Sequence, residues 1–171
     1  MSTSERWPAI PVADWQDTRD TLQLYTQVIG KVRLANEPLV NHWWSSALYV
    51  TARGLTTSLM PHPTGPAFQV DFDFLAHRLD ITTVDGAARA LALEDRTVAD
   101  FHDAVMALLD DLGVGTAIWP VPVEIPGAIP FRDDDGLPGV LPAYMLVVVI
   151  TALLGGPVFL LLLIKAERRY Q

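Results

Sequence analysis

The feature that most constrains this chain is residues 141–164, LPAYMLVVVITALLGGPVFLLLLI, an unbroken run without a charged side chain. Most of its residues are apolar. An α-helix rises about 1.5 Å per residue, so about 20 apolar residues cross the roughly 30 Å of hydrocarbon in a bilayer. A buried helix of a soluble domain usually shows a polar stripe, which this run lacks. We therefore expect Leu141–Ile164 to be a transmembrane helix, interrupted at Gly155-Gly156-Pro157.

This run divides the chain into parts of opposite charge. Residues 1–140 carry a net charge of −10, and residues 141–171 carry +2. We expect an α+β domain at 1–132, a linker at 133–140, the membrane-spanning segment at 141–164 and a basic tail at 165–171.

Two signals bear on the membrane topology, and they disagree. Positive charge is enriched on the cytoplasmic side of membrane proteins, and Lys165, Arg168 and Arg169 would place the C-terminus there. The N-terminus has no apolar region or cleavage site for export, which places the domain in the cytoplasm instead. We expect a single-pass, membrane-associated protein with a cytoplasmic N-terminal domain, although the basic tail argues for a cytoplasmic C-terminus.

Helical periodicity appears twice within positions 1–132. Asp14 is placed to cap a first helix with an apolar stripe at Trp15, Leu22, Tyr25, Ile29 and Val32, and Asn36-Glu37-Pro38 ends that helix. Lys31 and Arg33 suit the dipole at its end. Thr97 and Asp100 resemble a capping box for a second helix that Gly113 terminates. Its apolar face contains Val98, Phe101, Val105, Leu108 or Leu109, and Leu112.

Strand patterns lie between the two helices. Residues 47–52 and 55–60 predict two short strands with Arg53-Gly54 as a bulge or turn, and 68–74 alternates apolar and polar residues. Another strand begins at Leu79 and Ile81. Asp85-Gly86 predicts a type I′ turn with a return strand at 89–93, and 114–119 predicts a last strand. The fold class is therefore α+β, an antiparallel sheet of about four or five strands with two packed helices, plus the C-terminal hydrophobic helix.

Composition excludes several chemistries. Without cysteine there is no disulfide, thiolate metal site or cysteine nucleophile. A net charge of −8 argues against a nucleic-acid partner. The four histidines, His42, His62, His77 and His102, lack zinc spacing, and we expect His102 on the surface. No dinucleotide or phosphate loop is present, so we expect no metal site and no cofactor.

Two groups of residues are candidate ligand-binding sites. His42, Trp43, Trp44, Tyr49 and Arg53 could stack a planar or sugar-like ligand and pair its anionic group, or the indole rings could instead close the core. Asp71 and Asp73 share one strand face, about 6.6 Å apart at the usual rise, where they could share a cation or act as an acid–base pair. A solvated sheet face gives the same alternation.

Two resemblances to known families rest on longer motifs. Trp7-Pro8, DTLQLYTQVIGKVRL from Asp20, NHWW from Asn41, LYVTARGLTT from Leu48, DFDF from Asp71 and WPVPVEIP from Trp119 resemble the N-terminal part of an uncharacterised bacterial family of unknown function over residues 7–132. That resemblance implies no activity. Because family members continue with a further soluble region beyond Ile129–Asp134, it also implies a missing partner domain. Residues 141–169, with TALLGGPVFLLLLIKAERR from Thr151, weakly resemble the last helix of iron-siderophore ABC transporter permeases, which implies a permease subunit as partner.

Three hypotheses follow for the whole chain. The first is an uncharacterised acidic α+β domain attached to one membrane helix, with no specific reaction inferable. The second is a small-molecule binding module or enzyme fragment that uses His42, Trp43, Trp44 and Arg53. The third is a composite or frameshifted chain that ends in a permease-like helix.

Overall fold

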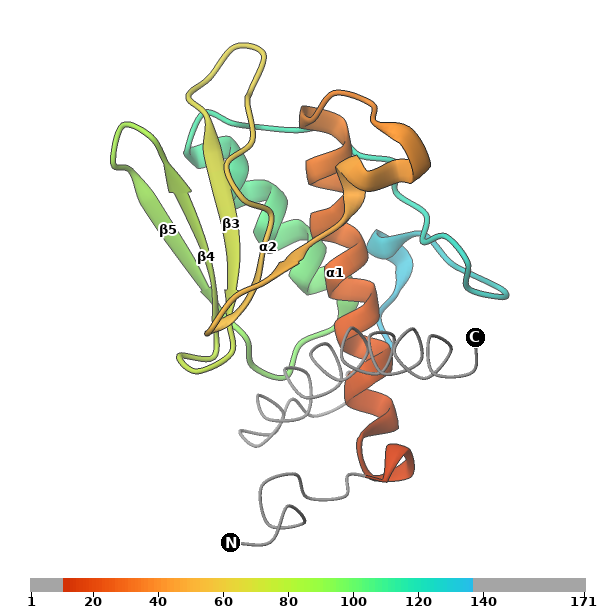
Figure 1. Cartoon of the computed structure of the whole chain (residues 1–171). Helices are drawn as coiled ribbons and strands as arrows, with labels where there is room; N and C mark the ends of the chain where they lie inside the picture. Colours follow the sequence, from red (N-terminus) through yellow and green to blue (C-terminus); the bar gives the residue numbers. More distant parts are fainter. Residues whose placement is uncertain (1–10, 137–171) are drawn as a thin grey trace, which may run out of the picture.

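The computed structural model describes residues 11–136 and shows an α+β fold, with two helices packed on one face of an antiparallel sheet (Figure 1). The expected α+β class with about four or five strands is confirmed. The segment expected to span the membrane, Leu141–Ile164, lies outside the described residues. Among residues 11–136, no helix has the length and apolar character needed to cross a bilayer.

The first helix, α1 (Gln16–Asn36), follows a 3-10 turn, η2 (Val12–Trp15). Asp14 does not cap α1 as predicted, because it lies inside η2, where its N–H bonds to the carbonyl of Pro11 at 3.0 Å. Trp15 occupies the cap position without a side-chain hydrogen bond. The predicted stripe is otherwise correct, since four of its residues are buried: Leu22, Tyr25, Ile29 and Val32.

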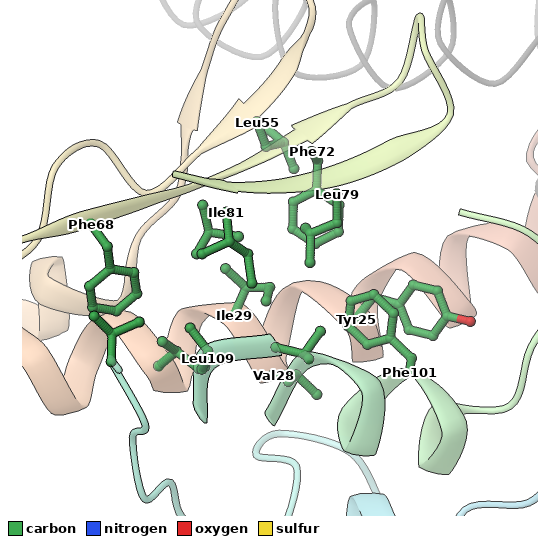
Figure 2. Close-up of a cluster of buried hydrophobic side chains, with 14 of the residues drawn as sticks. Tyr25, Val28, Ile29, Leu55, Phe68, Phe72, Leu79, Ile81, Phe101 and Leu109 are labelled. Carbon is green, nitrogen blue, oxygen red and sulfur yellow. The ribbon is translucent and has the colours of Figure 1, made fainter. Parts of the chain in front are cut away.

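The sheet is a simple meander in the order β1-β2-β3-β4-β5. Its strands are β1 (Tyr49–Val50), β2 (Gly54–Thr56), β3 (Phe68–Asp73), β4 (Arg78–Thr83) and β5 (Ala88–Ala92). In β3, Phe68, Val70 and Phe72 face the core, as the alternation predicts. Figure 2 shows side chains of the sheet meeting those of α1 and α2.

The hairpin between β4 and β5 differs from the predicted type I′ turn. Its loop is Val84-Asp85-Gly86, closed by a hydrogen bond of 2.9 Å from the N–H of Thr83 to the carbonyl of Ala87. Only Gly86 has a positive φ, at 91°. A three-residue hairpin loop needs one left-handed residue where a type I′ turn needs two, so Asp85 keeps an ordinary conformation.

The second helix, α2 (Val98–Asp111), begins and ends where the sequence indicates. The hydroxyl of Thr97 accepts from the N–H of Asp100 at 3.0 Å, and Gly113 follows the helix with φ 70°. Leu109, rather than Leu108, is the fully buried residue of the two alternatives. Tyr25 of α1 stacks on Phe101 of α2 with ring centroids 3.8 Å apart, which joins the helices within the core.

The strand predicted at 114–119 is absent, because other groups bind this segment's backbone and side chains. The N–H of Val114 bonds back to Leu109 in α2, and the carbonyl of Gly115 contacts the ring of His62 at 3.2 Å. The side chain of Asn36 in α1 donates to the hydroxyl of Thr116 at 3.0 Å. The segment therefore runs along the helices and leads to a short 3-10 turn, η4 (Phe131–Asp133).

Candidate functional site

The most distinctive surface of the domain is the aromatic loop, which we define as residues 38–52. None of its residues is charged. The loop includes a 3-10 turn, η3 (Asn41–Ser46), and the edge strand β1. Six large apolar side chains in it are exposed: Leu39, Val40, Trp43, Trp44, Tyr49 and Val50. Trp43 and Trp44 are 63% and 64% exposed, so these indole rings do not close the core.

The backbone of η3 has an unusual conformation. His42 and Trp43 both lie in the left-handed region, with φ of 56° and 57°. Such angles are uncommon for residues other than glycine, and each costs about 1–3 kcal/mol unless surrounding contacts compensate. The hydroxyl of Ser46 donates to the carbonyl of Trp43 at 2.8 Å, and the N–H of Ala47 donates to that of Trp44 at 3.2 Å. These bonds close the turn that displays the two rings.

The main support of the loop is Arg33 of α1, a residue for which the sequence indicates only a favourable interaction with the helix dipole. Its side chain is 7% exposed, and Nη1 donates to the carbonyls of Trp44 at 2.9 Å and Ala47 at 2.6 Å. Nη2 lies 3.8 Å from Glu37, and the guanidinium lies 5.0 Å from the ring centroid of Tyr49. Arg33 thus joins the end of α1 to both η3 and β1.

Gly30 provides the second contact between α1 and the aromatic loop. It is buried, and a Cβ at this position would lie 3.0 Å from the carbonyl oxygen of Ser46. A glycine in a helix costs about 1 kcal/mol relative to alanine, and here it permits the close approach of η3. The aromatic loop is therefore seated against successive turns of α1, by Gly30 and then by Arg33.

Arg53 is not a neighbour of the indole rings. It follows β1 at the turn before β2, and Figure 1 shows this turn and η3 at opposite ends of the orange segment that contains β1. Its Nε donates to Oδ2 of Asp73 at 2.7 Å. The structure thus gathers His42, Trp43, Trp44 and Tyr49 in one loop and places Arg53 with Asp73 instead.

Asp73 is the most buried carboxylate of the predicted site. Its Oδ1 accepts from the N–H groups of Leu75 at 3.1 Å and Ala76 at 2.9 Å. Burial alone would raise the pKa of Asp73, but the hydrogen bonds from Arg53 and Ala76, followed by the charge of Arg53 and the N–H of Leu75, hold that pKa below its ordinary value. Asp73 therefore stabilises the β3–β4 turn in its carboxylate form, by accepting hydrogen bonds from the backbone of that turn.

Asp71 has different partners from Asp73. Its Oδ2 accepts from the side-chain amide of Gln69 at 2.7 Å, and across the sheet it lies opposite Asp80, which pairs with Arg78 at 2.9 Å. Residues 11–136 contain no group of three or more histidines and carboxylates able to hold a metal ion. Along this sheet face, each carboxylate has its own donor.

A second polar cluster, which the sequence did not indicate, joins α2 to η4. His102 is 4% exposed, so the expected surface position is wrong. Its ring stacks on Phe131 with centroids 5.9 Å apart, and Nδ1 lies 2.8 Å from Oδ1 of Asp103. The same oxygen accepts from Arg132 at 3.1 Å. The hydrogen bond from His102 lowers the pKa of Asp103 against a smaller effect of burial, and the positive charge of Arg132 lowers it further.

The arrangement of this cluster explains why His102 is buried. Phe131 is fully buried and covers one side of the imidazole, while Asp103 and Arg132 close the outer edge. The N–H of Ala99 also bonds to the carbonyl of Asp134 at 3.0 Å. The cluster attaches the end of the described chain to α2.

The comparisons with known proteins confirm the resemblance inferred over residues 7–132. The model of a family described as "Family of unknown function (DUF5996)" matches residues 7–138. No curated protein matches, and no solved structure matches.

Proposed function

The chain belongs to this family of unknown function, for which no specific reaction is inferable, and we propose that the whole chain acts by binding rather than by catalysis. In this proposal the protein is a single-pass, membrane-tethered domain. Residues 141–164 span the bilayer, and the α+β domain presents the aromatic loop on the cytoplasmic side.

The observation that carries the proposal is the uncharged, apolar run at positions 141–164. The fold supports the proposal because the folded domain ends close to the first residue of this run. Phe131 is fully buried and η4 is attached to α2, so the folded domain extends to the last few described residues. Only residues 137–140 separate Gly136 from Leu141. A fully extended chain covers at most about 3.6 Å per residue, so this tether is less than about 20 Å long.

Carbonate extraction of membranes from cells that express the full chain tests the span. We expect the chain to stay in the pellet. As a matched control, Val148→Arg combined with Leu153→Arg places two charges within the run, each costing about 2.5–3.5 kcal/mol at the centre of a membrane helix, and should release the chain. Recovery of the unaltered chain in the carbonate supernatant would contradict the proposal.

The proposed topology can be tested separately, because the chain has no cysteine of its own. Ala87→Cys places a thiol at an exposed position directly after the β4–β5 loop, and Gln171→Cys places one in the basic tail. With a cytoplasmic domain and one span, a membrane-impermeant maleimide added to intact cells labels only the tail thiol. Labelling of the Ala87→Cys variant alone would reverse the topology, and protection of both would exclude a single span.

Small-molecule binding is the second candidate function. The observation in its favour is that two adjacent indole rings are exposed in a turn whose backbone is held by Arg33. Benzoate as a planar anion and glucose as a sugar are suitable probes for the detergent-solubilised chain. This candidate predicts saturable quenching of tryptophan emission by one of them, weakened in Trp43→Phe and unchanged in Trp15→Phe. The absence of saturable quenching by both probes would count against it.

A composite chain is the third candidate, and the end of the family match favours it. The match stops at residue 138, just before the hydrophobic run begins at Leu141. Under this candidate, residues 141–169 are the last helix of a permease-like protein. An adjacent reading frame that encodes further permease helices would support it, and a neighbourhood without one would count against it.

A further inference from the structure

The three most exposed tryptophans described in the structure lie on two segments that α1 holds. Trp43 and Trp44 belong to the aromatic loop, and Trp119 is 69% exposed. Trp119 lies in what we call the proline loop, residues 116–130, which contains four prolines and joins α2 to η4. Val123 and Ile129 of the proline loop are also exposed.

The two loops occupy neighbouring positions on α1. The aromatic loop is seated at Gly30, where the carbonyl of Ser46 approaches the helix. The proline loop is attached at Gln27, whose side-chain amide donates to the carbonyl of Val123 at 2.9 Å and accepts from its N–H at 2.8 Å. Residues three apart are neighbours on a helix surface. Figure 1 shows η3 of the aromatic loop and the proline loop on the side of α1 away from β3, β4 and β5.

The aromatic loop and the proline loop together form a surface that we call the aromatic face, and this surface is nearly free of charged side chains. Residues 38–52 contain no charged side chain, and residues 116–130 contain only Glu124. In the whole chain, by contrast, 19% of residues are charged and acidic residues outnumber basic ones by 20 to 12. The aromatic face can therefore be buried without the desolvation of several carboxylates, and the desolvation of a carboxylate costs free energy.

We propose that the aromatic face contacts the lipid headgroup region of the bilayer to which residues 141–164 tether the domain, so this inference rests on the proposed function. Tryptophan and tyrosine prefer the interface between hydrocarbon and water, where the ring is shielded and its polar group stays hydrated. The proline loop leads directly into η4 and Gly136. The tether from there to Leu141 is less than about 20 Å long, which keeps the domain close to the membrane.

The charge of the protein favours a lipid occupant over a second copy of the chain. Two copies with a net charge of −8 each repel one another on approach. An electrically neutral phosphatidylcholine surface imposes no such repulsion. For the same reason, we expect added anionic lipid to weaken the contact, because a negatively charged surface repels a negatively charged protein.

Tryptophan fluorescence tests the contact directly, because residues 141–164 contain no tryptophan. The full chain is reconstituted in phosphatidylcholine vesicles with bromine atoms at either a shallow or a deep position of the acyl chains, which quench nearby indoles. We expect stronger quenching by the shallow label. Replacing Trp43, Trp44 and Trp119 together by phenylalanine should remove most of it, whereas the matched Trp15→Phe variant should retain it.

Carbonate extraction of the same vesicles separates failure of the inference from failure of the proposed function. A chain that resists extraction but shows no quenching would overturn the lipid contact while leaving the span intact. Quenching that survives in the triple variant would overturn it as well. If cross-linking in vesicles instead joins two copies through their aromatic faces without quenching, the occupant is a second copy and the proposal is wrong. A chain released by carbonate invalidates the proposed function itself.

Discussion

Arg33 and Asp73 are charged residues that are 6% and 7% exposed, and each uses its charge to bind the backbone of a loop. Arg33 donates to the carbonyls of Trp44 and Ala47 at the end of η3, and Asp73 accepts from the N–H groups of the β3–β4 turn. Burial of a charge is unfavourable unless hydrogen bonds compensate it. Both residues therefore order loops that contain few buried apolar side chains.

Replacement of Arg33 tests its role in the aromatic loop. Lysine cannot reach two carbonyls and Glu37 with one ammonium group, so Arg33→Lys should lower the free energy of unfolding by about 1.5–3 kcal/mol. Arg19→Lys is the matched control, because Arg19 is exposed and forms a surface ion pair with Asp20, and its effect should stay within about 0.5 kcal/mol. Urea titration of the full chain in a non-ionic detergent, followed by far-ultraviolet circular dichroism, measures both. Equal effects would show that Arg33 does not hold the loop.

The lowered pKa of Asp73 predicts a pH dependence with a defined sign. A carboxyl group whose pKa is lower in the folded state stabilises the fold above its unfolded pKa of about 3.9, and this contribution is lost as the pH falls through the folded pKa. Asp73→Asn should therefore cost about 1–3 kcal/mol at neutral pH and progressively less below about pH 4. Urea titrations between neutral and acidic pH measure the difference.

Asp111→Asn serves as the control for Asp73, because Asp111 pairs with Arg89 on the surface and is 57% exposed in its side chain. Its effect should stay within about 0.5 kcal/mol at neutral pH. If Asp73→Asn lowers the free energy of unfolding by the same amount down to strongly acidic pH, the hydrogen bonds of Asp73 do not depend on its ionised carboxylate, and this prediction is wrong.

These residues also show what the sequence could not predict. A basic residue in the last turn of a helix suits the dipole, so Arg33 carried no sign of its second role. Its partners Trp44 and Ala47 lie beyond the end of α1, next to a turn where His42 and Trp43 adopt angles that their residue types do not indicate. The aromatic cluster was predictable as a group of residues, but its separation from Arg53 depends on the length of β1 and the turn after it.

The elements of the sheet depend on backbone geometry as much as on apolar pattern. Gly54 begins β2 opposite Asp73 with φ 153°, and a Cβ there would lie 2.0 Å from the carbonyl oxygen of Phe72. β2 therefore approaches β3 more closely than a side chain would allow. The alternation in β3 and the cap at Thr97 could be predicted because they depend on near neighbours. The absence of a strand at 114–119 could not, because its partners His62 and Asn36 are distant in sequence.

Gly54→Ala tests this close approach. The added methyl group meets backbone that cannot rotate away, so the variant should lose about 2–4 kcal/mol of stability. Gly86→Ala is the matched control, because Gly86 also has a positive φ but a Cβ there would have no atom within 4 Å. That variant should lose about 1 kcal/mol, the cost of the left-handed conformation alone. Thermal unfolding compares the two, and similar losses would exclude the steric explanation.

At the scale of the whole molecule, the core joins segments from both ends of the described chain. Tyr25 stacks on Phe101, and Phe131, close to the last described residue, is fully buried. The fold therefore continues through the proline loop to η4. From the sequence, the prolines after Trp119 indicate only that regular strand pairing is prevented there, and apolar periodicity cannot show that a single phenylalanine returns to the core.

Phe131→Ala tests whether η4 is part of the folding unit. Removal of a fully buried phenylalanine typically costs about 3–5 kcal/mol. Ile129→Ala is the control, because Ile129 belongs to the same segment but is 46% exposed, and it should change stability by no more than about 1 kcal/mol. Urea titration of the full chain measures both variants. A small effect of Phe131→Ala would show that η4 is attached without contributing to the core.

The meander of the sheet has a consequence for the order of events during synthesis. Every strand of the sheet pairs with its neighbours in sequence, so each hairpin can close as soon as its second strand leaves the ribosome, and the entropic cost of closure rises only slowly with loop length. α1 is made first, yet Phe101, on which Tyr25 stacks, belongs to α2 and is made only after the whole sheet. The apolar stripe of α1 therefore stays partly uncovered until α2 emerges, and this interval is when the nascent chain is most exposed to chaperones and to aggregation.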